Sequence, residues 1–236
     1  RELLAEQPAA GDLQLQRHAP GRVGQEPGRL GPDAADGGEV RGVGVADQLG
    51  QFGVDRLAPL NAGLGRLGKV HANNIAFKIP NATLTAACSI VPAELEYAKN
   101  ELGVTDLYTD YREMLEKADI DAVAIVTTSS EHCWQIEAAL DAGKHVFTDK
   151  PLGVDLEQCK LAEAAVERHP DQVFFLGFMR RYDSSYAYAK KKIQEGAIGK
   201  PYMVKAIGID PEALVEGSIK FAATSGGIFI DMAIHD

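Results

Sequence analysis

The glycines Gly63, Gly65 and Gly68 stand at a spacing that could bind phosphate. They fit the pattern G-x-G-x-x-G, in which the first glycine permits a tight turn, the second lets the backbone approach a pyrophosphate, and the third lets a helix pack closely on its strand. The start of that helix offers free N–H groups and the positive end of its dipole. Because 24 glycines in 236 residues can produce such a spacing by chance, a glycine-rich loop without a ligand is the alternative.

A lysine and an acid–histidine pair are two further candidates for chemistry. Lys150 follows a short apolar run and precedes Pro151, which cannot continue a strand, so the ammonium turns toward a cleft. Asp231 and His235 are four residues apart, and in a helix this spacing places both side chains on one face. Taken alone, such a pair is more often a surface pair.

Helix and strand patterns alternate regularly after the glycine motif. The continuous apolar run at 122–127 is typical of a parallel strand that is buried on both faces. The alternation predicts an α/β fold, a Rossmann-type doubly wound parallel sheet whose ligand lies at the carboxyl ends of the strands. The expected strands are 84–88, 122–127, 145–148 and 173–177, and the expected helices are 67–79, 92–102, 130–142 and 155–169.

Polar residues follow two of these strands. An acid that bonds the ribose 2'-hydroxyl of NAD is expected about twenty residues after the glycine motif, but this chain has Ser89 there. Serine can hydrogen-bond the ribose and does not repel a 2'-phosphate, but no arginine follows closely to bind such a phosphate. The choice between NAD and NADP therefore stays open. Thr127, Thr128 and Ser129 end another strand, and His132 lies just beyond. For these hydroxyls, capping a helix is as good an interpretation as contacting a cofactor.

Residues 1–58 differ in composition from the rest of the chain. They contain 11 of the 24 glycines, one of the 16 aromatic residues, and six arginines without a lysine, whereas the remainder has five arginines and thirteen lysines. A segment with so few large apolar groups cannot offset the entropy lost when its chain becomes ordered. We therefore expect residues 1–58 to be disordered. The abrupt switch in composition also suggests that this segment is not the native start.

The strand that should lead into the glycine motif is unusual. Residues 57–62 contain Pro59, which removes a ladder donor, and the polar Asn61. We therefore expect the first strand to be damaged or replaced. The run 39–46 could replace it, but it is rich in glycine and lies far upstream.

Composition limits the classes of partner. The net charge of -10 argues against nucleic acid and against an anionic membrane surface. Cys88, Cys133 and Cys159 lack paired metal spacing, which favours reduced thiols, a cytoplasmic location and no bound metal. We find no apolar run long enough to span a bilayer.

Taken together, separated blocks of the chain resemble the Gfo/Idh/MocA oxidoreductases, most closely the inositol 2-dehydrogenases among them. The resemblance covers about residues 62–236. The family usually has Glu before the lysine, and Asp149 here is one methylene shorter but leaves Lys150 in place. The matching blocks are 63–68 with His71, 127–132, Lys150-Pro151, 177–183, and the glycine pair 226–227 followed by Asp231 and His235.

The resemblance implies roles for several residues. His235 would accept the hydroxyl proton of a polyol, Asp231 would orient the substrate or the imidazole, and Lys150 would stabilise the developing alkoxide during hydride transfer. Met179 and Arg180 would line the substrate pocket, although core packing is the better interpretation for Met179 alone. The residues expected to contact NAD or NADP are Gly63, Leu64, Gly65, Arg66, Leu67, Gly68, Ser89, Thr127, Thr128, Ser129, His132, Asp149 and Lys150.

The resemblance also implies a division of the chain. Residues 59–178 would form the dinucleotide-binding domain, and 179–236 would begin a truncated second domain that opens with a strand at 202–209. Full-length relatives are expected to be homo-oligomers that act on a small polyol. Because much of the second domain would be missing, we expect weak or absent turnover. The alternatives are a sugar or dihydrodiol dehydrogenase, a non-catalytic nucleotide-binding regulator, or a defective fragment.

Overall fold

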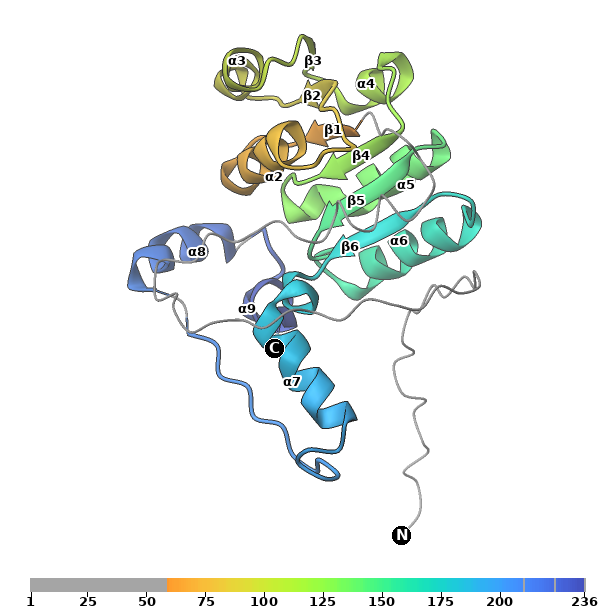
Figure 1. Ribbon diagram of the computed structural model, residues 1–236. Coiled ribbons are helices and arrows are strands. Elements are labelled where there is room, and N and C mark those ends of the chain that lie inside the picture. The colour runs from red at the N-terminus through yellow and green to blue at the C-terminus, as the bar shows by residue number, and fades with distance from the viewer. Residues whose placement is uncertain (1–58, 210, 223, 236) are drawn as a thin grey trace. The chain divides into compact units, whose positions relative to one another are not determined.

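The structure is a computed structural model of the 236-residue chain, and it describes residues 59–209, 211–222 and 224–235 (Figure 1). The predictions of disorder in residues 1–58 and of a substitute strand at 39–46 lie outside the described residues.

The described residues form a six-stranded parallel sheet with the strand order β3-β2-β1-β4-β5-β6. The order reverses between β1 and β4, which is the switch point where the ligands of such sheets bind. This arrangement confirms the predicted doubly wound fold. The strands are β1 (Pro59–Ala62), β2 (Ala86–Cys88), β3 (Asp106–Tyr108), β4 (Ala122–Ile125), β5 (His145–Asp149) and β6 (Phe174–Gly177).

Helices cover both faces of the sheet (Figure 1), and alternate residues of each strand face opposite sides. In β4, Val123 and Ile125 join one buried cluster with residues of α4, α5 and α6, whereas Ala124 joins a second cluster with residues of α2 and α3. These helices are α2 (Arg66–Phe77), α3 (Pro92–Leu102), α4 (Tyr111–Lys117), α5 (His132–Asp141) and α6 (Leu156–Arg168).

The prediction of a damaged first strand was wrong. β1 pairs in parallel with both β2 and β4. Pro59 is the first residue of the strand, a position where its missing N–H is tolerated. The Asn61 side chain is fully buried, and its amide nitrogen donates to the carbonyl oxygens of Gly63 (2.7 Å) and Gly68 (3.3 Å). The polar residue therefore fastens the glycine turn to the strand instead of breaking the strand.

The residues after β6 form short helices. These are η3 (Met179–Tyr182), α7 (Ser184–Gln194), η4 (Glu212–Leu214), α8 (Val215–Ala222), α9 (Ile228–Asp231) and η5 (Ala233–His235). The prediction of a strand at 202–209 was wrong, because these residues form no hydrogen-bonded ladder with any described segment. The expected single helix through Asp231 and His235 is also wrong, since α9 ends at Asp231 and a 3-10 turn follows. No helix in the described ranges is both long and apolar enough to cross a membrane.

Candidate functional site

The glycine turn between β1 and α2 has the shape that its sequence predicts. Gly63 has a φ of +85°, and a Cβ there would come within 2.5 Å of the Val126 carbonyl oxygen. A Cβ on Gly68 would overlap the Gly63 carbonyl oxygen, so this glycine lets α2 pack on the turn. At Gly65, which caps α2, the position of a Cβ is open except for a Glu94 carboxylate oxygen at 4.0 Å. The exposed turn and the helix start therefore fit a pyrophosphate.

The side chains between these glycines take different positions. Leu64 is fully buried in the cluster shared with α2 and α3, so its side chain serves packing. Arg66 and Leu67 are exposed in the first turn of α2. Contact of this turn with a cofactor stays a prediction, and it would involve the backbone and the exposed side chains.

At the end of β2, Ser89 is engaged with a residue that sequence analysis missed. The Ser89 hydroxyl donates to the Glu94 carboxylate at 2.5 Å and accepts from the backbone N–H of Val91 at 3.1 Å. Glu94 lies in the first turn of α3 and is half-buried. The available signal was an acid just after Pro92, in a helix that begins at the end of this strand.

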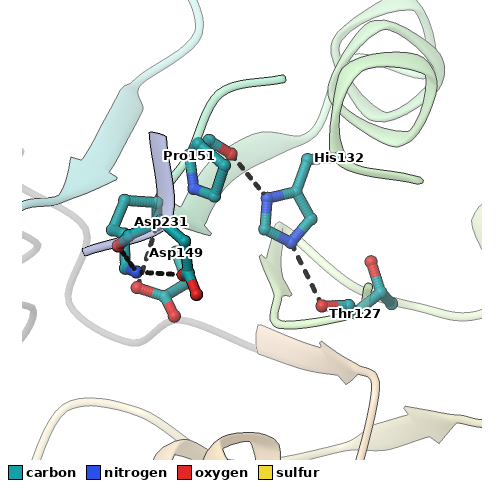
Figure 2. A network of polar contacts seen from close by, with 6 residues as sticks. Thr127, His132, Asp149, Pro151 and Asp231 are labelled. Carbon is teal, nitrogen blue, oxygen red and sulfur yellow. Dashed lines mark hydrogen bonds and ion pairs between the residues drawn. The ribbon is translucent and has the colours of Figure 1, made fainter. Parts of the chain in front are cut away.

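Lys150 and Asp231 meet although they are 81 residues apart in the chain. The Lys150 ammonium lies 2.7 Å from the Asp231 carboxylate and also donates to the Asp231 backbone carbonyl, as Figure 2 shows. Their side chains are only 16% and 19% exposed. The Lys150 backbone N–H donates to the Asp149 carboxylate at 2.9 Å. After the carboxyl end of β5, the Lys150 ammonium is therefore paired with Asp231, while the Asp149 carboxylate accepts from the Lys150 backbone.

His235 lies in the electrostatic field of this cluster. Burial lowers the pKa of its imidazole, the positive charges of Lys150 and Arg180 lower it further, and Asp149 and Asp231 oppose them. Its Nδ1 is buried without a hydrogen-bond partner among the described residues, and so is the Nε of Arg180. A ligand with hydroxyl groups could satisfy both atoms.

His71, on α2, faces the same end of β5. Its ring packs on Phe147 with a centroid distance of 5.2 Å. Burial lowers the pKa of the imidazole, and the Asp149 carboxylate opposes that shift. Because Asp149 acts on the pKa values of both His71 and His235, the end of β5 links the glycine-turn helix to η5 electrostatically.

His132 joins the ends of β4 and β5. One ring nitrogen lies 2.7 Å from the Pro151 carbonyl oxygen and the other 3.3 Å from that of Thr127 (Figure 2). The side chain is 2% exposed. The Thr127 hydroxyl donates to Gln135 at 2.6 Å, Ser129 is buried and Thr128 is exposed. These contacts favour a supporting role for His132, while cofactor contact by the threonines and serine stays a prediction.

Met179 and Arg180 lie in η3, directly after β6. Core packing was the wrong interpretation for Met179, because this residue is 49% exposed. The Arg180 guanidinium lies 4.9 Å from the Tyr186 ring centroid. The positive charge of Arg180 also lowers the pKa of His235. Lining of a substrate pocket by these two residues stays a prediction.

Known proteins resemble this chain in sequence and in structure. The profile of an oxidoreductase family with an NAD-binding Rossmann fold matches residues 61–178. The scyllo-inositol 2-dehydrogenase (NAD(+)) of Bacillus subtilis is 41% identical over 74% of this chain and 50% of its own length. The myo-inositol 2-dehydrogenase of Thermotoga maritima is 35% identical over 74% and 51%. The chain spans about half the length of these curated relatives.

A solved structure agrees with the sequence comparison. The crystal structure of scyllo-inositol dehydrogenase from Lactobacillus casei, with bound NAD(H) and scyllo-inositol, superposes with a TM-score of 0.73 at 50% identity. The match covers 77% of this chain and 54% of that one.

Proposed function

The chain belongs to the Gfo/Idh/MocA oxidoreductase family, and from this premise we propose that it contributes to a dehydrogenase that moves hydride between a nicotinamide dinucleotide and a cyclic polyol of the inositol type. The observation that carries the proposal is the contact between the Lys150 ammonium and Asp231, with His235 in the field of both. The named inositol dehydrogenases among its relatives support the substrate class.

The residues of this cluster suit oxidation of a secondary alcohol. Lys150 would donate a hydrogen bond to the reacting oxygen and stabilise its developing negative charge. His235 would accept the hydroxyl proton, because its lowered pKa keeps the imidazole neutral at neutral pH. Asp231 would hold the Lys150 ammonium in place. When the dinucleotide is bound at the glycine turn, its nicotinamide supplies the hydride acceptor.

Unsatisfied polar atoms support a ligand with many hydroxyl groups. The Arg180 Nε and the His235 Nδ1 are buried without partners in the described part of the chain. Such groups are costly to leave unpaired, and a polyol offers both donors and acceptors. Ring hydroxyls near the Lys150–Asp231 pair would satisfy them.

The test compares Lys150→Ala with Lys160→Ala. Lys160 lies on α6 and makes only an exposed contact with Glu157, so it controls for loss of a surface charge. Formation of reduced dinucleotide is followed by absorbance with myo-inositol, scyllo-inositol, a hexose and a dihydrodiol. In the full-length protein we expect inositol oxidation that Lys150→Ala lowers by at least about 10²-fold and that Lys160→Ala leaves unchanged. Turnover that survives Lys150→Ala would refute the mechanism, and a preference for another substrate would refute the substrate class.

A further inference from the structure

The end of β2 is where a dinucleotide fold distinguishes NAD from NADP, and this chain has no acid at that strand end. Ser89 occupies the position and is 7% exposed. Its hydroxyl already donates its hydrogen to Glu94 and accepts from the Val91 N–H. Ser89 therefore has no hydrogen left to donate to a ribose.

Glu94 reaches the same place from the first turn of α3. One carboxylate oxygen, Oε2, accepts from Ser89, which fixes the orientation of the side chain. The other oxygen, Oε1, lies 4.0 Å from the position of a Cβ on Gly65, and no other described residue outside the turn comes that close. A carboxylate oxygen thus borders the open side of the turn that fits the pyrophosphate.

On this geometry, and on the dinucleotide site of the proposed function, we infer that Glu94 binds the adenosine ribose hydroxyls and selects NAD over NADP, and that Ser89 is its positioning residue. A carboxylate accepts hydrogen bonds from a ribose diol. A 2'-phosphate in the same place would be repelled by the negative charge of the Glu94 carboxylate, and it would lack the 2'-hydroxyl that donates to this carboxylate. The Ser89–Glu94 pair would therefore perform the task of a strand-end acid.

Two cations near the turn could favour NADP instead. The Lys69 ammonium lies 4.8 Å from the centroid of the Tyr97 ring on α3, so an aromatic face already holds it. Arg66 is exposed beside Gly65, and a phosphate held by its guanidinium is the competing outcome. The experiment therefore includes Arg66→Ala.

Binding of NADH and NADPH to the full chain is measured by nicotinamide fluorescence, without polyol. Wild type is expected to bind NADH at least about tenfold more tightly than NADPH. Glu94→Gln should weaken NADH binding by about tenfold while NADPH binding holds or improves. Ser89→Ala should shift the ratio in the same direction by less. The control Glu96→Gln removes the same charge from an exposed position two residues along α3 and should change neither affinity.

A second variant separates recognition from damage to the fold. Ser89→Asp combined with Glu94→Gln returns an acid to the strand end and should restore the preference for NADH, with an unchanged melting temperature. The inference would be overturned if the wild type bound both dinucleotides equally or bound neither. It would also be overturned if Glu94→Gln weakened both equally, or if Arg66→Ala abolished NADPH binding in a protein with no preference for NADH. Because no polyol is present, failure to oxidise inositol with an intact NADH preference would count against the proposed function alone.

Discussion

The sheet region, residues 59–178, and the C-terminal region, residues 179–235, bury their apolar side chains to different extents. Ile125 and Ile136 are fully buried in the sheet region, whereas Tyr202 and Phe229 are 96% and 82% exposed. Among the described residues, no member of either buried cluster lies after residue 178. The sheet region therefore has its own core, to which the described residues of the C-terminal region add no buried member.

The contact between the two regions is polar at the site itself. The ammonium of Lys150, directly after β5, meets Asp231 of α9, and His235 lies within the field of the same charges. Apolar burial stabilises the sheet, while the acid–base residues come from a segment with little burial of its own. Stability and chemistry should therefore respond to different substitutions.

The largest expected effect comes from truncating a buried side chain of the sheet region. Ile136→Ala should lower the free energy of unfolding by about 2–5 kcal/mol, because it removes contacts of a fully buried side chain and leaves a cavity. Ile219, which is 69% exposed on α8, is the matched site in the C-terminal region, and Ile219→Ala should cost less than about 0.5 kcal/mol. Urea unfolding measures both variants. Equal losses would show that the two regions share one core.

A smaller effect on stability, with a large one on activity, is expected for Asp231→Asn. The substitution removes the charge partner of Lys150, but the Asp231 backbone carbonyl still accepts from the ammonium. We expect a loss of about 1 kcal/mol in thermal unfolding together with a fall in polyol oxidation. Glu216→Gln, which removes an exposed partner of Lys220, is the control and should alter neither quantity. If both variants behave alike, the Lys150–Asp231 contact does not form the site.

The fold of the sheet region was largely predictable, because glycine spacing and apolar runs are local signals. The glycine turn and most of the strands and helices follow from them, although β3 and α4 were not among the expected elements. The first strand was misjudged because the sequence does not show that the Asn61 amide finds its acceptors in the turn that follows. Glu94 was missed for a related reason, since only the turn of α3 brings its carboxylate back to Ser89.

The C-terminal region was harder to predict because its signals depend on tertiary partners. The apolar run at 202–209 has strand character, but a strand forms only where another segment supplies its ladder. The spacing of Asp231 and His235 indicated one helical face, whereas α9 ends at Asp231 and His235 follows in a 3-10 turn. Asp231 nevertheless contacts Lys150, and both residues act on the pKa of His235. The catalytic roles of these three residues stay a prediction.

The smallest expected effect is the pH dependence of stability, which also separates the regions. Burial lowers the pKa of His71 below the ordinary 6.5, and Asp149 opposes this shift. Well above pH 6.5 the imidazole is neutral in both the folded and unfolded states, so it contributes nothing to the pH dependence. As the pH falls toward and below 6.5, the unfolded chain binds the proton more readily than the folded one, so the protein loses stability until the pH passes the folded-state pKa. His71→Gln should remove this loss, as measured by urea unfolding at each pH. His235→Gln should change the slope less, because the half-buried His235 lies outside the core and Asp149 and Asp231 oppose the effects of Lys150 and Arg180 on its pKa. A larger effect from His235 would show that the C-terminal region unfolds together with the sheet.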